Sequence, residues 1–321
     1  MSAAGREDVA TGYVENVLII PELRLQIAGR DIVPQEAVTY PWTLSFEVER
    51  GFRGKALFYE KPFDVDASDE EICCLSNLYS QNFYHWVSEE LPRVVALEQT
   101  GFTGRYLVSG LPPFALQFLK LLGVPEARVL TRLDRPTVFR RVAFVSAIDV
   151  THINAYPELY LDTRRILIDA VTDVPGPFPR RIWLERITGV NNTGRDLANR
   201  EEVSVLLTKY GFESVDMASL PVARQIACAS RAEILAGVHG AALVHALFLP
   251  EAAGVVECYS PLFINPGILQ ISRLMKLDYS MLVYEIAYHG YPYGKRVMVN
   301  CDHLEAVLQR LCSGKACNER G

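Results

Sequence analysis

The chain lacks the long apolar segments of a membrane protein. No stretch of its 321 residues approaches the roughly 18 consecutive apolar residues of a transmembrane helix. The N-terminal sequence MSAAGREDVATGYVENV has no basic region followed by an apolar stretch, so we expect no signal peptide. These absences favour a cytoplasmic protein, and they leave peripheral association with the inner face of the membrane open.

Cysteine and clustered positive charge are also scarce. The seven cysteines are scattered, and no C-x-x-C pair occurs that would indicate a zinc site. Cys312 and Cys317 could pair or bind a metal, but a frayed tail is the favoured interpretation, and a reducing compartment is expected. The net charge is −6 and no dense Lys/Arg block occurs, which argues against nucleic-acid binding. An anionic ligand would therefore depend on a few placed cations.

What the chain does have is enough apolar sequence for two cores, since 50% of its residues are hydrophobic. Predicted strands are 17–20, 23–27, 44–48, 56–59, 72–76, 106–109, 138–145, 182–185, 214–216, 234–238 and 254–257. Predicted helices are 82–98, 113–122, 157–170, 199–210, one opening near Pro221, 241–249, 266–275 and 302–311. Asn199 and Glu202 have the spacing of a capping box. Strands and helices that alternate with short connections predict an α/β fold with a parallel, doubly wound sheet.

A cluster of breakers predicts the domain boundary. The segment Val174-Pro175-Gly176-Pro177-Phe178-Pro179 holds three prolines in five residues, which cannot continue a helix or a central strand. We therefore expect an α/β domain over residues 1–174 and a Rossmann-like domain over 175–300. Residues 301–321 would form a C-terminal helix and tail, for which packing back on the first domain is one option.

The turn Val238-His239-Gly240-Ala241-Ala242 joins a predicted strand to a predicted helix. Small residues there let a ligand approach the main chain, and the N–H groups of a helix start suit an anion. Ligands bind parallel sheets at the carboxyl ends of the strands. The turn therefore predicts a seat for a diphosphate, the alternative being a tight turn whose small residues only pack.

Two motifs carry a family resemblance. Asn82-Phe83-Tyr84-His85-Trp86, followed by Glu90-Leu91-Pro92-Arg93, resembles the N-x-x-H-W…L-P-R signature of glycosyltransferase family 61. Gly237-Val238-His239-Gly240-Ala241-Ala242-Leu243, with Glu257 after it, resembles that family's G-x-H-G-A-x-L…E segment. The resemblance covers roughly residues 72–260 and is closest to bacterial-type members.

The resemblance implies a GT-B-like enzyme with two Rossmann-type domains facing a cleft. It would transfer a sugar with inversion from a nucleotide sugar, typically UDP-linked, to a glycan or lipid-linked acceptor of surface polysaccharide synthesis. Such enzymes commonly need no metal. The chain departs from the family pattern at His245, where relatives often carry asparagine, and at Asn199-Arg200-Glu201, where Asn-Glu is usual.

The donor site is predicted in the second domain. Glycosyl transfer leaves negative charge on the departing diphosphate, so it needs cations or oriented N–H groups there. Arg186, after a strand end, and Arg195 are the candidate phosphate ligands, with surface arginines as the alternative. His239, Gly240, Ala241 and Ala242 would surround the diphosphate. Glu257, at a predicted strand end, would accept the ribose hydroxyls, unless it is a solvated acid.

The acceptor site is predicted in the first domain. His85 lies in the first turn of its helix, where a neutral imidazole can take the proton of the acceptor hydroxyl. Glu89, four residues on, shares its helix face and would orient His85 or act as the base itself. Asn82 is first an N-cap and second an acceptor ligand. Trp86 is either a platform for the acceptor sugar or a core residue.

Three rival interpretations are weaker. Asp64-Val65-Asp66 resembles a metal-binding D-x-D, but it precedes a predicted strand within an acidic stretch, which favours a solvated loop. His245 is expected to be a packed histidine and not a catalyst. No G-x-G-x-x-G follows a predicted strand, which argues against a dehydrogenase. A catalytically inactive nucleotide-binding scaffold with the same fold remains the alternative to a glycosyltransferase.

Overall fold

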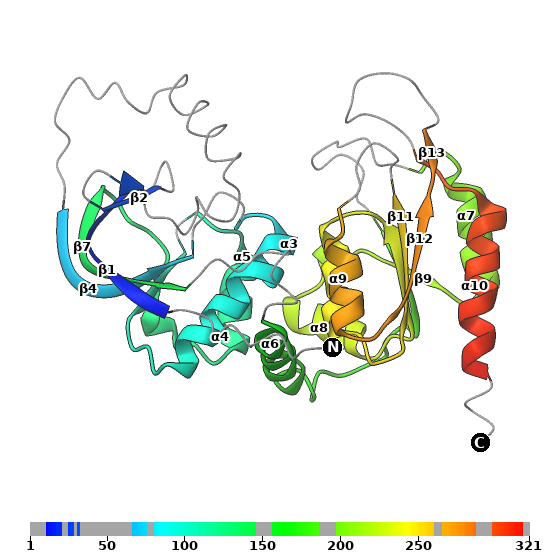
Figure 1. Ribbon diagram of the computed structural model, residues 1–321. Coiled ribbons are helices and arrows are strands. Elements are labelled where there is room, and N and C mark those ends of the chain that lie inside the picture. The colour runs from blue at the N-terminus through cyan, green and yellow to red at the C-terminus, as the bar shows by residue number, and fades with distance from the viewer. Residues whose placement is uncertain are drawn as a thin grey trace, which may run out of the picture. The chain divides into compact units, whose positions relative to one another are not determined.

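The computed structural model describes residues 11–20, 25–28, 31–32, 66–75, 80–108, 110–145, 156–185, 197–259, 265–286 and 297–316 (Figure 1). The chain divides into two compact units, Met1–Ile166 and Leu167–Gly321. The division lies inside helix α6 (Pro157–Asp169), shortly before the proline-rich segment predicted as the boundary. Each unit combines helices with a sheet that contains parallel strands, which confirms the predicted α/β class.

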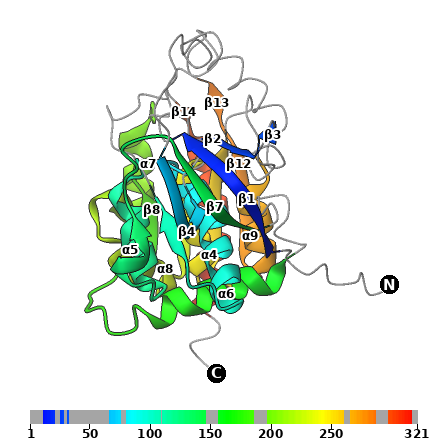
Figure 2. The same cartoon turned by 90° about the vertical axis from the view of Figure 1, so that its left-hand side faces the viewer.

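The first unit is built on a mixed sheet with the strand order β3-β2-β1-β7-β4-β5-β6. Its strands are β1 (Thr11–Ile20), β2 (Leu25–Ala28), β3 (Asp31–Ile32), β4 (Asp66–Cys74), β5 (Arg105–Leu107), β6 (Val129–Leu130) and β7 (Thr137–Val145). From β7 to β6 the neighbours are parallel, whereas β1 runs antiparallel to β7. Figure 2 shows β1, β7 and β4 beside one another. Val17, Ile72, Phe139 and Val142 belong to its buried core.

Strand β4 begins earlier than the sequence predicts. Asp66 already pairs with Thr137 of β7, so the acidic residues that we expected in a loop before Ile72 belong to the strand. Cross-strand ion pairs stabilise this exposed half: Glu71 contacts Arg141 at 2.9 Å and Glu70 contacts Arg105 at 3.0 Å. Alternation of apolar residues could not reveal this part of the strand because charges occupy it.

The helices of the first unit are α3 (Phe83–His85), the π-helix η1 (Trp86–Glu90), α4 (Leu91–Gln99), α5 (Pro113–Leu121), the short 3₁₀ helix η2 (Glu126–Arg128) and most of α6. The predicted helix over 82–98 is therefore continuous in the chain but contains a π-helical segment. The predicted strands at 44–48 and 56–59 lie outside the described residues.

The second unit contains a parallel five-stranded sheet with the order β12-β11-β10-β8-β9. Its strands are β8 (Arg181–Leu184), β9 (Glu213–Val215), β10 (Ile234–Val238), β11 (Gly254–Tyr259) and β12 (Asp278–Val283); β13 (Glu285–Ile286) and β14 (Val297–Met298) form a separate pair. From β8 the chain first goes outward to β9 and then crosses back to β10. The order of a doubly wound sheet thus reverses between β8 and β10, and this is where such sheets bind ligands.

Helices cover both faces of this sheet. They are α7 (Arg200–Lys209), the 3₁₀ helices η4 (Met217–Ser219) and η5 (Ala241–Phe248), α8 (Val222–Ser230), α9 (Gly267–Leu274) and α10 (Cys301–Ala316). Figure 1 shows α7 and α10 on one side of the strands and α8 and α9 on the other. Among the described helices, none has both the length and the apolar composition of a membrane span.

The C-terminal helix α10 contributes Leu304, Leu308 and Leu311 to the core of the second unit. One capping prediction needs correction. Asn199 precedes α7 without a capping bond to the main chain of that helix. Its side-chain amide instead forms hydrogen bonds with both the N–H and the carbonyl of Val299, 100 positions away. The predicted cap is therefore absent because its side chain binds a distant segment.

Candidate functional site

The predicted diphosphate seat lies where the strand order of the second sheet reverses. Strand β10 ends at Val238, and its neighbour β8 ends at Leu184. Gly237 is paired with Leu184, and a Cβ atom at Gly237 would lie only 3.0 Å from the Cβ of Leu184. The two strands therefore approach closely, and His239 leaves the sheet at the reversal point.

The turn at residues 239–242 is partly exposed to solvent, whereas the residues on either side of it are buried. From Ile234 to Leu249 every residue is buried except His239, Gly240, Ala241 and Ala242. The His239 N–H donates to the carbonyl of Cys258 at 2.8 Å, so it is not available to a ligand as the sequence predicted. Among the described residues, the N–H groups of Gly240, Ala241 and Ala242 have no main-chain acceptor. These three donors can meet an anion.

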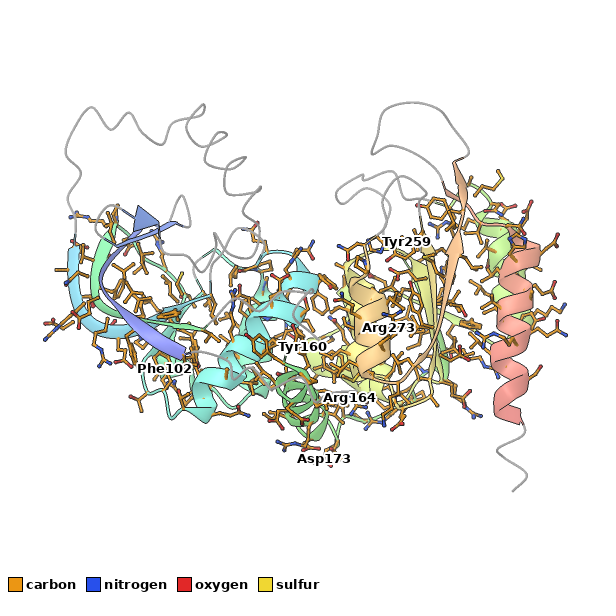
Figure 3. The ribbon with its side chains drawn as sticks, in the orientation of Figure 1. Phe102, Tyr160, Arg164, Asp173, Tyr259 and Arg273 are labelled. Atoms are coloured by element: carbon orange, nitrogen blue, oxygen red, sulfur yellow. The ribbon has the colours of Figure 1, made fainter. Side chains whose placement is uncertain are left out.

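The side chain of His239 is held by a buried carboxylate. Nδ1 lies 2.6 Å from Oε1 of Glu257, whose side chain is 0% exposed, whereas that of His239 is 15% exposed. The hydroxyl of Tyr279 donates to Oε2 of Glu257 at 2.8 Å. The ring of Tyr259, which is labelled in Figure 3, stacks on the imidazole with 4.7 Å between the ring centroids and an angle of 21°. A carboxylate at Nδ1 fixes the orientation of the imidazole ring.

Glu257 has a different environment from the one its sequence position suggests. Strand β11 continues to Tyr259, so Glu257 lies inside the strand and not at its end. Both carboxylate oxygens already accept hydrogen bonds, and the side chain is not exposed. In this geometry the carboxylate serves His239, and the predicted contact with ribose hydroxyls has no exposed oxygen to use.

The first unit contains a second histidine–carboxylate pair. Nδ1 of His85 lies 2.7 Å from Oε1 of Glu89, which confirms the contact predicted from their spacing. The side chain of Glu89 is 1% exposed and that of His85 is 19% exposed. A buried carboxylate on Nδ1 fixes the tautomer in which Nε2 accepts a proton, and it stabilises the imidazolium that then forms.

A proline shapes the helix that carries this pair. Pro92 has no N–H, so it cannot donate to the carbonyl of Ser88 one turn earlier. The π-helical segment ends at Glu90, two residues before Pro92, and the hydroxyl of Tyr160 on α6 donates to the Ser88 carbonyl at 2.8 Å. The side-chain hydroxyl of Ser88 in turn donates to the carbonyl of Tyr84 at 2.7 Å. Single π-turns inside α-helices often occur at functional sites.

Glu90 and Arg93 form a buried ion pair in the same helical segment as the His85–Glu89 pair, which we call the first dyad. Nη1 of Arg93 lies 3.3 Å from both carboxylate oxygens of Glu90, and the hydroxyl of Ser80 donates to Glu90 at 3.0 Å. Both side chains are almost completely buried. Burial raises the pKa of Glu90 above its ordinary value, although the positive charge of Arg93 lowers it. The pair therefore anchors the helix, while Glu89 faces His85.

The two predicted acceptor ligands differ in their surroundings. Asn82 is the N-cap of α3, and its side-chain oxygen accepts the N–H of Tyr84 at 2.9 Å, as the sequence predicted. Trp86 is 0% exposed and packs near Phe114, with 6.3 Å between the ring centroids. Its burial supports the core alternative over the sugar platform.

His245 is a packed histidine, as expected. It is buried, with Nδ1 2.6 Å from the Ala242 carbonyl and Nε2 3.0 Å from Oε1 of Gln225. Burial lowers its pKa to about 4. In its neutral form the ring has a single N–H, which can donate to one of these two oxygens, and the side chain is enclosed between η5 and α8.

Arg186 and Arg195, the predicted phosphate ligands, lie outside the described residues, as do Asp64 and Val65. Arg186 follows Glu185, which forms an ion pair with Arg200 at the start of α7. Within the described ranges no group of three His, Cys, Asp or Glu side chains could hold a metal ion. The phosphate-binding roles of Arg186 and Arg195 stay predictions.

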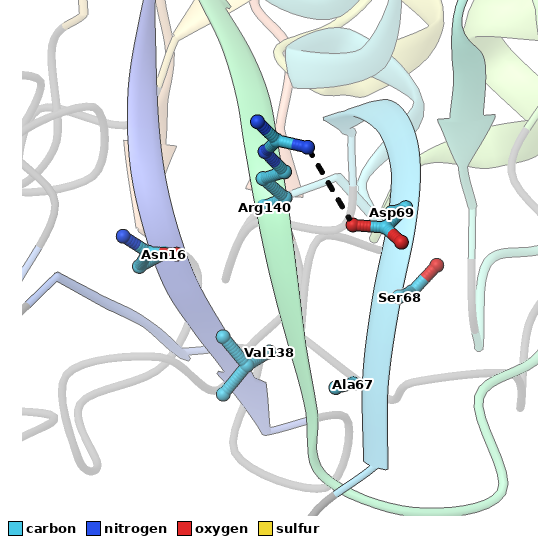
Figure 4. A pocket seen from close by; sticks show the side chains of 6 residues that line it. All are labelled: Asn16, Ala67, Ser68, Asp69, Val138 and Arg140. Carbon is cyan, nitrogen blue, oxygen red and sulfur yellow. Dashed lines mark ion pairs between the residues drawn. The ribbon is translucent and has the colours of Figure 1, made fainter.

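A pocket of about 240 Å³ lies elsewhere in the first unit (Figure 4). It is lined by Asn16 of β1, Val138 and Arg140 of β7, and Ala67, Ser68 and Asp69 of β4. Arg140 and Asp69 form a highly exposed ion pair at 4.0 Å. The residues that line the pocket include neither His85 nor His239, and its ion pair is exposed to solvent, where such pairs contribute little to stability.

Sequence reasoning missed Tyr279 and Tyr259. Both lie on the face of the sheet that carries Glu257, because side chains alternate along each strand and the register pairs Glu257 with Met281. Strand β12 was not predicted, although the segment Asp278–Val283 follows a helix in a regular strand–helix alternation. That alternation was the signal that could have found the strand and with it Tyr279.

Comparison with known proteins supports a transferase. The family model described as Glycosyltransferase 61 matches residues 83–256, more than half of the chain. The chain is 38% identical over 69 residues to an EGF domain-specific O-linked N-acetylglucosamine transferase of Drosophila melanogaster, covering 21% of this chain and 13% of that protein. It is 36% identical over 98 residues to the Beta-1,2-xylosyltransferase XAX1 of Oryza sativa subsp. japonica, covering 30% of this chain and 16% of that protein. The chain thus aligns with less than a fifth of the length of either relative.

Proposed function

Since the chain belongs to the glycosyltransferase 61 family, we propose that it moves a sugar from a UDP-linked donor to a glycan or lipid-linked acceptor with inversion. Surface polysaccharide assembly at the inner face of the membrane is the proposed setting. The observation that carries the donor half is the turn at residues 239–242. Three of its N–H groups have no main-chain acceptor within the described part of the chain, and they lie beside a histidine where the strand order reverses. Such a turn suits the diphosphate of a nucleotide sugar.

We propose that the donor diphosphate contacts the N–H groups of Gly240, Ala241 and Ala242 and Nε2 of His239. Arg186 and Arg195 are proposed as the cations that balance its charge, so that no metal is required. The negative charge that develops on the departing diphosphate would meet donors that are already oriented, which lowers the barrier without reorganisation.

On the acceptor side, His85 is proposed as the base that takes the proton of the acceptor hydroxyl. The acceptor hydroxyl oxygen forms a bond to the anomeric carbon while the bond from that carbon to the diphosphate oxygen breaks, and its electron pair leaves with the diphosphate. The hydroxyl proton passes to Nε2 of His85, and Glu89 stabilises the resulting imidazolium through Nδ1. The distance of 2.7 Å between Nδ1 and Glu89 supports this role. A GT-B-like arrangement, with the two units facing a cleft, is part of the proposal.

Thermal-shift screening with UDP, GDP, CMP and their sugars tests the donor half. A ligand that binds only the folded protein raises the melting temperature by an amount set by its concentration relative to Kd. We expect UDP to raise it in the wild type and to have a much smaller effect in Arg186→Ala and His239→Gln. Lys276→Ala, which removes an exposed cation paired with Glu251, is the matched control and should keep the full shift.

A transfer assay with the sugar donors that bind then tests the reaction. Release of UDP that depends on an acceptor would support a transferase. If no nucleotide shifts the melting temperature, the donor site is wrong. If UDP binds but no sugar is transferred to any glycan or glycolipid acceptor, the inactive nucleotide-binding scaffold becomes the better description.

A further inference from the structure

We propose that Tyr279 is a positioning residue of the donor site: its hydroxyl holds Glu257, and Glu257 holds His239 so that Nε2 meets the diphosphate. The inference rests on the proposed function, because it assigns a task to a residue that would not touch the donor itself. We call Tyr279, Glu257 and His239 together the relay. They come from three neighbouring strands, since His239 follows β10, Glu257 lies on β11 and Tyr279 lies on β12.

The register of the sheet explains why these side chains meet. Glu257 is paired with Gly237 on one side and with Met281 on the other, and residues two apart in a strand share a face. His239 and Tyr279 therefore project on the same face as Glu257, one from each neighbouring strand. Gly237 has no side chain, which leaves space beside the carboxylate in the middle of a parallel sheet.

In the relay, Tyr279 and His239 both donate hydrogen bonds to the carboxylate of Glu257. The hydroxyl of Tyr279 lies 2.8 Å from Oε2 of Glu257, and Nδ1 of His239 lies 2.6 Å from Oε1. Burial, together with the negative charge of Glu257, raises the pKa of Tyr279, so its hydroxyl keeps its proton and donates to the carboxylate. A carboxylate fixed at both oxygens cannot rotate away from the imidazole. A buried carboxylate without such partners would be costly to keep ionised.

The relay also specifies the protonation of the bound state. Nδ1 donates to Glu257, so Nε2 can donate to a phosphate oxygen only when the ring carries both protons. A neutral His239 must then take up one proton from solvent when the diphosphate binds. Of the described residues, Glu257 and Tyr259 on β11 contact this ring, and Tyr279 on β12 contacts Glu257.

Titration calorimetry of the full chain with UDP tests the proposal. Measurements at one pH in two buffers of different ionisation enthalpy give both Kd and the number of protons taken up. We expect the wild type to take up part of a proton, and Tyr279→Phe to raise Kd about 3- to 10-fold, as loss of one hydrogen bond predicts, and to take up fewer protons. Tyr210→Phe removes a hydroxyl that donates to Glu305 at 3.1 Å in the same unit, and it should match the wild type.

The outcomes separate this inference from the proposed function. If His239→Gln binds UDP as tightly as the wild type, the proposed donor site itself fails. If His239→Gln loses affinity while Tyr279→Phe keeps the wild-type Kd and proton uptake, the positioning role of Tyr279 is wrong. If the wild type takes up no proton when UDP binds, the proposed protonation of His239 to an imidazolium is wrong. A purely structural role of Tyr279 would lower the melting temperature and leave the proton uptake unchanged.

One measurement tests the relay in the wild-type protein and needs no Tyr279 variant. The ¹⁵N resonances of histidine-labelled wild-type protein, with His239 assigned by its loss in His239→Gln, report which ring nitrogen carries the proton. We expect Nδ1 of His239 to be protonated without ligand and both nitrogens to be protonated with UDP. A ring protonated at Nε2 alone without ligand would overturn the relay.

Discussion

Tyr160 donates its hydroxyl to the main-chain carbonyl of Ser88 at 2.8 Å, across 72 positions of sequence. The bond compensates for the one that Pro92 removes from the helix, because a proline has no N–H to give to the carbonyl one turn before it. Ser88 lies between His85 and the ion pair of Glu90 with Arg93. The hydroxyl of Tyr160 therefore supports the turn that places the first dyad.

Tyr160→Phe should leave the Ser88 carbonyl without this donor in a buried position. We expect a loss of about 1 to 3 kcal/mol in the free energy of unfolding, the cost of an unsatisfied buried polar group. Urea denaturation measures it. Tyr210→Phe, whose hydroxyl bonds to Glu305 near the surface, should cost clearly less. Equal losses in the two variants would show that the Ser88 contact has no special weight.

Glu89→Gln tests the charge on the first dyad while it keeps an oxygen near Nδ1 of His85. We expect kcat to fall about 10- to 100-fold, since an uncharged amide stabilises the imidazolium less than a carboxylate does. UDP binding by calorimetry should be unchanged. Glu98→Gln lies in the same helical segment but bonds to Tyr106 and Arg128, so it should retain kcat. A Glu89→Gln enzyme with wild-type kcat would remove Glu89 from the mechanism.

The two histidine–carboxylate pairs, His85–Glu89 and His239–Glu257, show which contacts a sequence can predict. His85 and Glu89 are four positions apart on one helix, so local geometry alone predicts their contact, and the structure confirms it. His239 and Glu257 are 18 positions apart, with His239 directly after β10 and Glu257 within the neighbouring strand β11. Both residues were expected at the donor site, but their contact depends on strand register, which the sequence does not specify.

The same distinction applies to the fold. Strand β10, helix α5 and strand β7 were predicted within one or two residues, because apolar periodicity and breakers mark them locally. The π-helical segment was not, since it depends on Pro92 and on a partner hydroxyl from α6. Strand β4 was predicted too short, because its exposed acidic half is stabilised by arginines of other strands.

His245 gives a pH-dependent contribution to stability. Its pKa is about 4 in the folded protein and 6.5 ordinarily, because burial disfavours the charged ring. Between these values the unfolded chain binds more protons, so stability falls as the pH drops from 6.5 towards 4. From pH 7.5 to pH 5 this amounts to about 2 kcal/mol.

His245→Asn removes that contribution. Asparagine cannot titrate here and can keep one hydrogen bond to a neighbour. We expect the difference in unfolding free energy between the wild type and His245→Asn to change by about 2 kcal/mol between pH 7.5 and pH 5 in favour of the variant. Urea denaturation at both pH values measures it. A difference that does not vary with pH would mean that His245 is not neutral and enclosed in solution.

Arg93→Met should be the most destabilising of these changes, because it leaves Glu90 buried without its cation. Removing one member of a buried ion pair typically costs about 3 to 5 kcal/mol. The pKa of Glu90 is already raised by burial and is held down by Arg93. Without Arg93 it rises further, and a carboxyl whose folded-state pKa is raised loses stability as the pH increases through that pKa.

The loss in Arg93→Met should therefore be larger at pH 8 than at pH 5, as measured by urea denaturation. The double variant Arg93→Met/Glu90→Gln removes the unpaired charge and keeps an oxygen for the hydroxyl of Ser80, which donates to Glu90 at 3.0 Å. It should recover much of the stability and lose the pH dependence. A pH-independent loss in the single variant, with no recovery in the double variant, would mean that Arg93 acts by filling space and not through its charge.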